Sequence, residues 1–149
     1  MKTFSLSGVC AALLVAATAS AQTTSPFVLA KCDPQAITFD NVRLPQAVLA
    51  NGQPLAAGAY QVRITTERPT AAAGQSPSGE CWVEFVSNGA VAGREVASVI
   101  SAEEIGEVAK GPEPRPEAAR VDVLKGGEYL RVWMNHAGTH YVVNMPVAR

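Results

Sequence analysis

Short runs of β-branched and aromatic residues, separated by glycine, asparagine and proline, recur along most of this chain and constrain its fold more than any other feature. No long segment repeats apolar residues with the period of an amphipathic helix. This pattern is typical of antiparallel domains in which tight turns connect short strands. We therefore predict an all-β fold, a single immunoglobulin-like β-sandwich of about seven strands with one short helix.

The first 21 residues have the parts of a removable export signal in the usual order. Lys2 is followed by an apolar run at residues 9–17 and by small residues at 19–21, so we expect a signal helix at residues 1–21 and cleavage before Gln22. An uncleaved membrane anchor is the alternative, but the apolar run is shorter than the roughly 20 residues that a spanning helix needs. Residues 22–149 then form one β-sandwich domain in the periplasm or outside a bacterial cell, without stable membrane insertion.

The number and positions of the cysteines are consistent with an exported protein. Cys10 lies in the predicted signal, which leaves Cys32 and Cys81 as a pair. In an oxidising compartment such a pair predicts a disulfide. A redox pair or metal thiolates are the alternatives, but the spacing is not Cys-x-x-Cys and no histidine is near either cysteine in the sequence.

The formal net charge of −1 arises from 12 basic and 13 acidic residues spread along the chain. A nucleic-acid-binding protein needs a basic face to neutralise phosphates, so we expect no nucleic-acid partner. The chain also lacks a polybasic membrane anchor, and its sequence gives no reason to expect a cofactor.

Several local patterns place strands and turns. A first strand is predicted at residues 36–40, and the Asn88-Gly89 dipeptide predicts a hairpin turn between strands at 81–86 and 90–100. Two registers remain open for that hairpin, because Glu84 can face either Gly93 or Arg94. The capping-box spacing at residues 101–104 predicts a helix that ends by Gly111, before a proline-rich connector at 111–117.

The last 31 residues predict a three-stranded meander. A turn at Gly126-Gly127 pairs Asp122 with Arg131, and a loop at residues 135–138 pairs Trp133 with His140. One face of the meander is predicted to be core: Val121, Val123, Leu130, Val132, Met134, Tyr141, Val143 and Met145. The other face carries Arg120, Asp122, Leu124, Tyr129, Arg131, Trp133, His140, Val142 and Asn144.

That outer face is the leading candidate for function. Aromatic rings beside hydrogen-bonding groups suit a partner protein or a glycan. We therefore predict a non-enzymatic binding or structural protein of the bacterial envelope. The predicted binding residues are Tyr129, Arg131, Trp133, His140 and Asn144. The alternative is that the helix or the connector covers this face and that the arginines support the rings.

Two other functions remain open. His136 and His140 flank a turn, so a periplasmic metal-binding protein is an alternative, although a third ligand such as Asp122 is not placed by spacing. A small secreted hydrolase is the second alternative, and it predicts a deep polar cleft. The chain lacks a Gly-x-Ser-x-Gly nucleophile elbow, and no catalytic residues are assigned.

The sequence Leu-Ala-Ala-Gly-Ala-Tyr-Gln-Val at residues 55–62 resembles a strand-entry motif, Leu-Pro-Ala-Gly-Thr-Tyr-x-Val. Many secreted bacterial β-sandwich domains carry this motif, including uncharacterised families of exported proteins. The chain departs from it at Ala56 and Ala59. The resemblance implies an exported β-domain in which Tyr60 anchors the strand end, much as a tyrosine corner does. It implies no catalytic or binding residue.

Overall fold

The computed structural model describes residues 32–33, 35–71, 73 and 79–149. The predicted signal at residues 1–21 lies outside the described residues. Within the described part of the chain, no helix is both long and apolar enough to cross a membrane.

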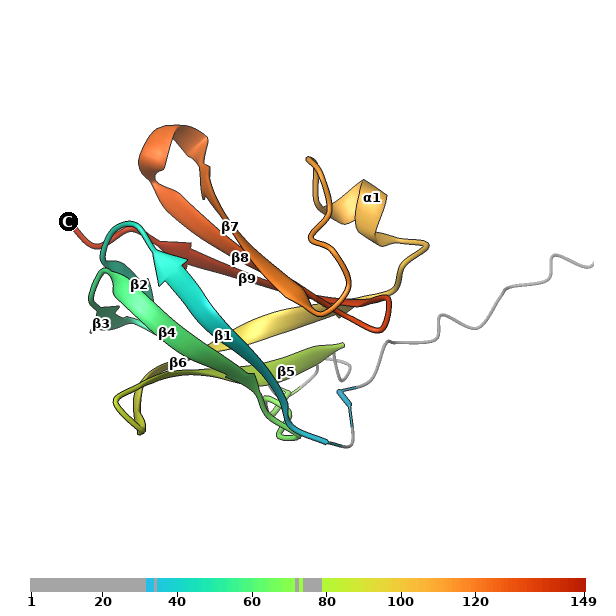
Figure 1. The fold of residues 1–149 in the computed structure, drawn as a ribbon, viewed down its shortest axis with the longest axis horizontal. Helices are drawn as coiled ribbons and strands as arrows, with labels where there is room; N and C mark the ends of the chain where they lie inside the picture. The colour runs from blue at the N-terminus through green and yellow to red at the C-terminus, as the bar shows by residue number, and fades with distance from the viewer. Residues whose placement is uncertain (1–31, 34, 72, 74–78) are drawn as a thin grey trace, which may run out of the picture.

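β-Strands are the main elements of the described chain (Figure 1). In chain order the elements are β1 (Ile37–Leu44), β2 (Val48–Ala50), β3 (Gln53–Leu55), β4 (Gly58–Ile64), β5 (Glu80–Ser87), β6 (Ala90–Ile100), α1 (Ile105–Val108), β7 (Ala118–Leu124), the 3-10 turn η1 (Lys125–Gly127), β8 (Tyr129–His136) and β9 (Thr139–Pro146).

Seven strands form one antiparallel sheet in the order β1-β4-β5-β6-β9-β8-β7, and β2 and β3 form a separate hairpin. The prediction of an all-β fold is confirmed. The expected sandwich of two sheets differs from this arrangement, because a single sheet curls until β1 and β7 approach each other and almost close a barrel (Figure 1). Twist and coiling let one sheet wrap around both sides of the same core.

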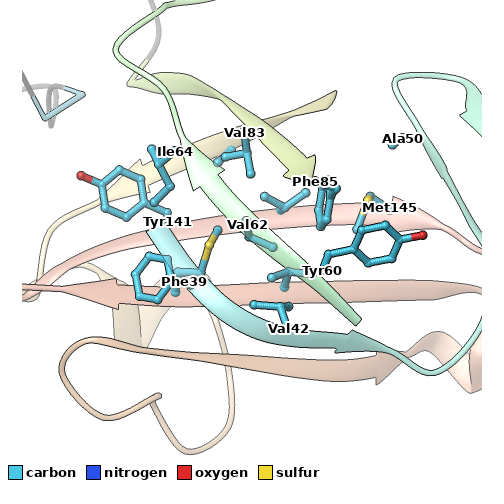
Figure 2. Packing of buried hydrophobic residues seen from close by; sticks show 14 of the residues in the cluster. Phe39, Val42, Ala50, Tyr60, Val62, Ile64, Val83, Phe85, Tyr141 and Met145 are labelled. Carbon is cyan, nitrogen blue, oxygen red and sulfur yellow. The ribbon is translucent and has the colours of Figure 1, made fainter. Parts of the chain in front are cut away.

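The main core lies inside the curled sheet (Figure 2). Figure 2 shows side chains of β1, β4 and β5, such as Phe39 and Phe85, pointing toward Tyr141 and Met145 of β9. Burial alternates along β4 and β5, since every second side chain of a strand points to the same face. Val62, Val83 and Phe85 are each 0 % exposed.

The strand-entry sequence runs from the last residue of β3 into β4. The Tyr60 hydroxyl donates a 2.8 Å hydrogen bond to the carbonyl of Ala56, four residues upstream, and the ring packs edge-on against Phe85. Tyr60 therefore anchors the start of β4, as the motif implied. Leu55 is 2 % exposed and packs over Gly93 of β6, where an added Cβ would lie 3.3 Å from the leucine side chain.

The predicted disulfide between Cys32 and Cys81 is present, with a Cα–Cα distance of 5.8 Å. It joins the segment before β1 to β5 across 49 residues of sequence. Cys81 is completely buried, so the bridge extends into the main core.

Both registers considered for the β5–β6 hairpin are present in part. Near the turn, Ser87 pairs with Ala90. A β-bulge between Phe85 and Val86 then shifts the register by one residue, so that Glu84 faces Arg94. The turn sets the first register and the bulge establishes the second.

The β7–β8 register is the predicted one, with Asp122 opposite Arg131. The β8–β9 register differs from the prediction by two residues, because Trp133 faces Val142 and His140 faces Asn135. Ala137 and Gly138 form a two-residue turn with positive φ angles of 50° and 82°, in place of the four-residue loop expected. A shift of two residues preserves which side chains share a face.

Candidate binding groove

Part of the outer face of β7, β8 and β9 is covered by α1 and by the connector, here residues 110–117 (Figure 1). Ile105 and Ala109 pack with Trp133, Val142 and Ile100 in a second apolar cluster outside the barrel. The alternative in which the helix or the connector covers this face is therefore observed around Trp133, whereas Asn144 is exposed.

The helix itself is shorter than predicted. It spans Ile105–Val108, one turn, rather than the stretch from Ser101 to Gly111. The Ser101 hydroxyl bonds to the Glu104 carboxylate instead of capping a backbone N–H group. Ala109 is already extended, and Gly111 has a φ of +115°, so the chain leaves the helix before Pro112.

Hydrogen bonds hold the connector against the sheet at three points. Arg131 donates to the carbonyl of Lys110 at 2.9 Å, Arg120 to that of Pro112 at 3.1 Å, and Asn135 to that of Pro114 at 3.1 Å. Each donor comes from β7 or β8. These side chains satisfy backbone carbonyls of a segment that has no strand partner of its own.

Trp133 and His140 lie beneath this cover. They are 0 % and 1 % exposed, and the indole Nε1 donates a 3.0 Å hydrogen bond to His140 Nδ1. Burial lowers the pKa of His140, although the carboxylate of Glu113, 3.8 Å from Nε2, opposes that effect. Two of the predicted binding residues are therefore packed inside the protein rather than presented to a ligand.

Arg131 is a buried cation with a half-buried partner. Its Nη2 lies 2.7 Å from Asp122, and its guanidinium stacks over Trp133 at 4.9 Å from the ring centroid. Burial alone would raise the pKa of Asp122, but hydrogen bonds from Arg131 and Arg120 outweigh it and hold the pKa below its ordinary value.

Beside this ion pair the surface is hollowed by a groove of about 360 Å³, which we call the α1 groove. It lies between the end of α1 and the β7–η1–β8 hairpin. Its lining residues are Val108, Ala109, Leu124, Lys125, Tyr129, Arg131, Val142 and Asn144. Aliphatic side chains thus meet two cations, a phenol ring and an amide in one groove.

Three of the predicted binding residues, Tyr129, Arg131 and Asn144, line the α1 groove. The outer-face pattern also contained Leu124 and Val142, but Val108 and Lys125 were missed as site residues. Val108 is 61 % exposed, and only the docking of α1 brings it to the sheet. Lys125 follows β7 with a φ of +49°, and its Nζ lies 4.8 Å from the Tyr129 ring centroid.

The two histidines are not brought together. His140 faces Asn135 across the hairpin, so the neighbouring His136 points to the opposite face of the sheet. There His136 Nδ1 lies 2.6 Å from the carboxylate of Glu117. Among the described residues, no group of three or more His, Cys, Asp or Glu side chains is arranged to hold a metal ion.

The His136–Glu117 pair borders a polar pocket of about 340 Å³ near the start of β1. The hydrogen bond from His136 lowers the pKa of Glu117. A histidine beside a carboxylate is part of a hydrolytic triad, but the described residues that line this pocket include no serine or cysteine nucleophile.

A second aromatic residue, Trp82 of β5, lies on the outer face of the β4–β5–β6 region. Arg94 stacks over its ring at 5.0 Å and also pairs with Glu84 and Glu67. Arg63 extends this set of ion pairs, at 2.5 Å from Glu84. The Trp82 ring therefore packs against an arginine that belongs to a surface ion-pair network.

Comparison with known proteins gives no identification: no family model matches this chain, and neither a curated protein nor a solved structure shows significant similarity to it.

Proposed function

We propose that this protein is an exported, non-enzymatic binding domain of the bacterial envelope, which holds a segment of a partner protein in the α1 groove. The observation that carries the proposal is the composition of the groove. Val108 and Leu124 provide apolar walls, while Lys125, Arg131 and Asn144 provide hydrogen-bond donors. Binding sites commonly combine a mainly apolar lining with a few polar groups that orient the ligand.

A protein partner fits the groove better than a glycan. Its walls are mainly aliphatic, and Tyr129 is the single aromatic ring among the lining residues. Aliphatic walls complement the apolar side chains of a polypeptide, whereas a sugar ring would leave its hydroxyl groups facing valine and leucine.

The proposed location outside the cytoplasm depends on the sequence of residues 1–21 and on the disulfide. A bridge between Cys32 and Cys81 forms and persists in an oxidising compartment. The resemblance of residues 55–62 to the strand-entry motif of secreted bacterial domains supports the same location. Mass spectrometry of protein purified from an exporting host without reductant should give a chain that begins at Gln22. A mass that includes residue 1 would contradict export by cleavage.

Binding at the groove is tested by photo-crosslinking in the exporting host. A benzoyl-phenylalanine residue in place of Val108 should give one defined covalent adduct with a partner protein. The matched control is the same residue in place of Val91, an exposed valine of β6 that does not line the groove. Filling the groove with Asn144→Trp, at an exposed position, should remove the Val108 adduct.

Adducts of equal yield at both positions, or an adduct at Val108 that survives Asn144→Trp, would contradict the proposed site. The metal-binding and hydrolase alternatives are not carried forward, because no observation on the described residues favours either one over binding in the groove.

A further inference from the structure

The fold leaves one hydrogen-bonding edge of a buried arginine unused at the α1 groove. Arg131 is 7 % exposed and lines the groove. Its Nε and Nη2 atoms donate to Asp122, and Nη2 also donates to the carbonyl of Lys110. Its Nη1 atom donates to no group among the described residues and keeps some contact with solvent. Two N–H groups of a fixed guanidinium therefore remain available to a ligand.

Lys125 adds a positive charge that the described residues do not neutralise. Its ammonium group lies over the Tyr129 ring, 4.8 Å from the centroid, and it has no carboxylate partner in the part of the chain that the structure describes. Arg131, by contrast, is paired with Asp122. The groove thus has one uncompensated cation beside one donor edge that is held in place by its other hydrogen bonds.

The aliphatic walls define the rest of the ligand. Val108 is 61 % exposed and faces the same groove as Leu124 and Val142. Covering these side chains removes apolar area from water and contributes favourably to binding. At about 360 Å³ the groove is near the lower limit for ligand sites, which are usually about 300–1,000 Å³, so it accommodates a short segment.

We infer that the partner segment presents a carboxylate group next to an aliphatic side chain, with the carboxylate bound by Lys125 and Arg131 and the aliphatic group lying against Val108 and Leu124. This inference rests on the proposed function and specifies the chemistry of the partner. A single carboxylate matches the one uncompensated positive charge, and the fixed guanidinium donors suit its planar oxygens.

The test uses two small probes that differ in one charge. N-acetyl-L-leucine carries a carboxylate and N-acetyl-L-leucinamide carries an amide in its place. Each is titrated into the isotopically labelled chain, residues 22–149, while NMR signals of Val108, Ala109 and Val142 are followed. We expect the carboxylate probe to shift these signals and to bind about fivefold more tightly than the amide, as for a partly exposed ion pair.

Two charge-removing variants locate the effect. Lys125→Gln should reduce the preference for N-acetyl-L-leucine over the amide, with the Arg131 donors left to bind the carboxylate. Lys110→Gln removes the same charge from the exposed end of α1, where the ammonium binds the carbonyl of Gly106, and should keep the preference. Raising the salt concentration should weaken binding of the carboxylate probe and leave binding of the amide probe unchanged.

Equal affinities for the two probes, a preference that is undiminished in Lys125→Gln, or no shift of the groove signals by either probe would overturn the inference. None of these results removes a crosslinked partner at Val108, so failure of the carboxylate chemistry is distinguishable from failure of the proposed function. Loss of the Val108 adduct would instead remove the basis of both.

Discussion

The indole nitrogen of Trp133 donates its hydrogen to Nδ1 of His140, and both side chains are completely covered by α1 and the connector. The bond requires an unprotonated Nδ1, because a protonated ring has donors at both nitrogens. Protonation of His140 would therefore break the hydrogen bond and place a charge in the outer cluster. Among the described residues, Glu113, at 3.8 Å from Nε2, is the one carboxylate that pairs with the ring.

We expect the stability of the protein to fall as the pH decreases from 7 to 5. The folded-state pKa of His140 is lowered by burial, so the unfolded chain, with an ordinary pKa near 6.5, binds the proton first. The free energy of unfolding is therefore highest above that value and decreases as the pH falls toward the folded-state pKa. Urea unfolding at several pH values measures the slope.

Matched asparagine variants identify the group responsible. His140→Asn keeps an acceptor near Trp133 Nε1 but does not titrate, so its stability should be nearly flat between pH 7 and 5. His136→Asn, at the partly exposed histidine, should retain most of the slope. If the two variants and the parent protein share one slope, His140 is not the cause.

Asp122→Asn should cost about 3 kcal/mol of the free energy of unfolding, because it leaves the buried Arg131 guanidinium without its charged partner. The exposed Glu67, which pairs with Arg94, offers the control, and Glu67→Gln should cost less than about 1 kcal/mol. Since the pKa of Asp122 is lowered, its contribution is present above about pH 4 and is lost as the pH falls through the folded-state value. Equal costs for the two variants would show that burial does not distinguish these pairs.

Removing the disulfide with the Cys32→Ala/Cys81→Ala double variant should destabilise the fold by about 4 kcal/mol in the chain-entropy model, since the bridge closes a loop of 49 residues. Dithiothreitol should lower the denaturant midpoint of the parent protein to that of the double variant. It should leave the midpoint of the double variant unchanged. A parent midpoint that does not respond to reduction would mean that the bridge adds no stability.

Replacing Gly93 or Gly106 by alanine should change the free energy of unfolding in opposite directions. In Gly93→Ala the new Cβ would lie 3.3 Å from Leu55 and 3.4 Å from Ala50, so the Leu55 side chain must shift by a few tenths of an ångström within a packed site, at a cost of about 1 kcal/mol. Gly106 lies within the exposed turn of α1 with no atom within 4 Å of an added Cβ. Gly106→Ala should stabilise α1 by about 0.5 kcal/mol. Thermal and urea unfolding distinguish the two, and a stabilising Gly93→Ala would contradict the packing described for β3.

Local signals predicted much of the fold. The Gly126-Gly127 turn and the alternation of faces fixed the β7–β8 register, including the Asp122–Arg131 pair. The β8–β9 register differs from the predicted one by two residues because Asn135 and His136 continue β8 instead of opening a four-residue loop. The Asn135 side chain also bonds to the connector, a contact that local sequence does not reveal.

Closure of the sheet and docking of α1 could not be predicted in the same way. Both depend on contacts between residues far apart in the chain, such as Ile105 against Trp133. The outer-face pattern therefore found Tyr129, Arg131 and Asn144 but could not tell that Trp133 and His140 would be covered, or that Val108 would form a wall of the groove.

The strand β8 is buried on both faces, with Val132 in the barrel core and Trp133 in the outer cluster. The protein thus has two apolar clusters, one on each face of β8, and they are made of different side chains. Substitutions in α1 and the connector can reshape the groove without disturbing the barrel interior. The shape of the α1 groove and the packing of the barrel interior therefore depend on largely separate sets of side chains, and β8 contributes to both.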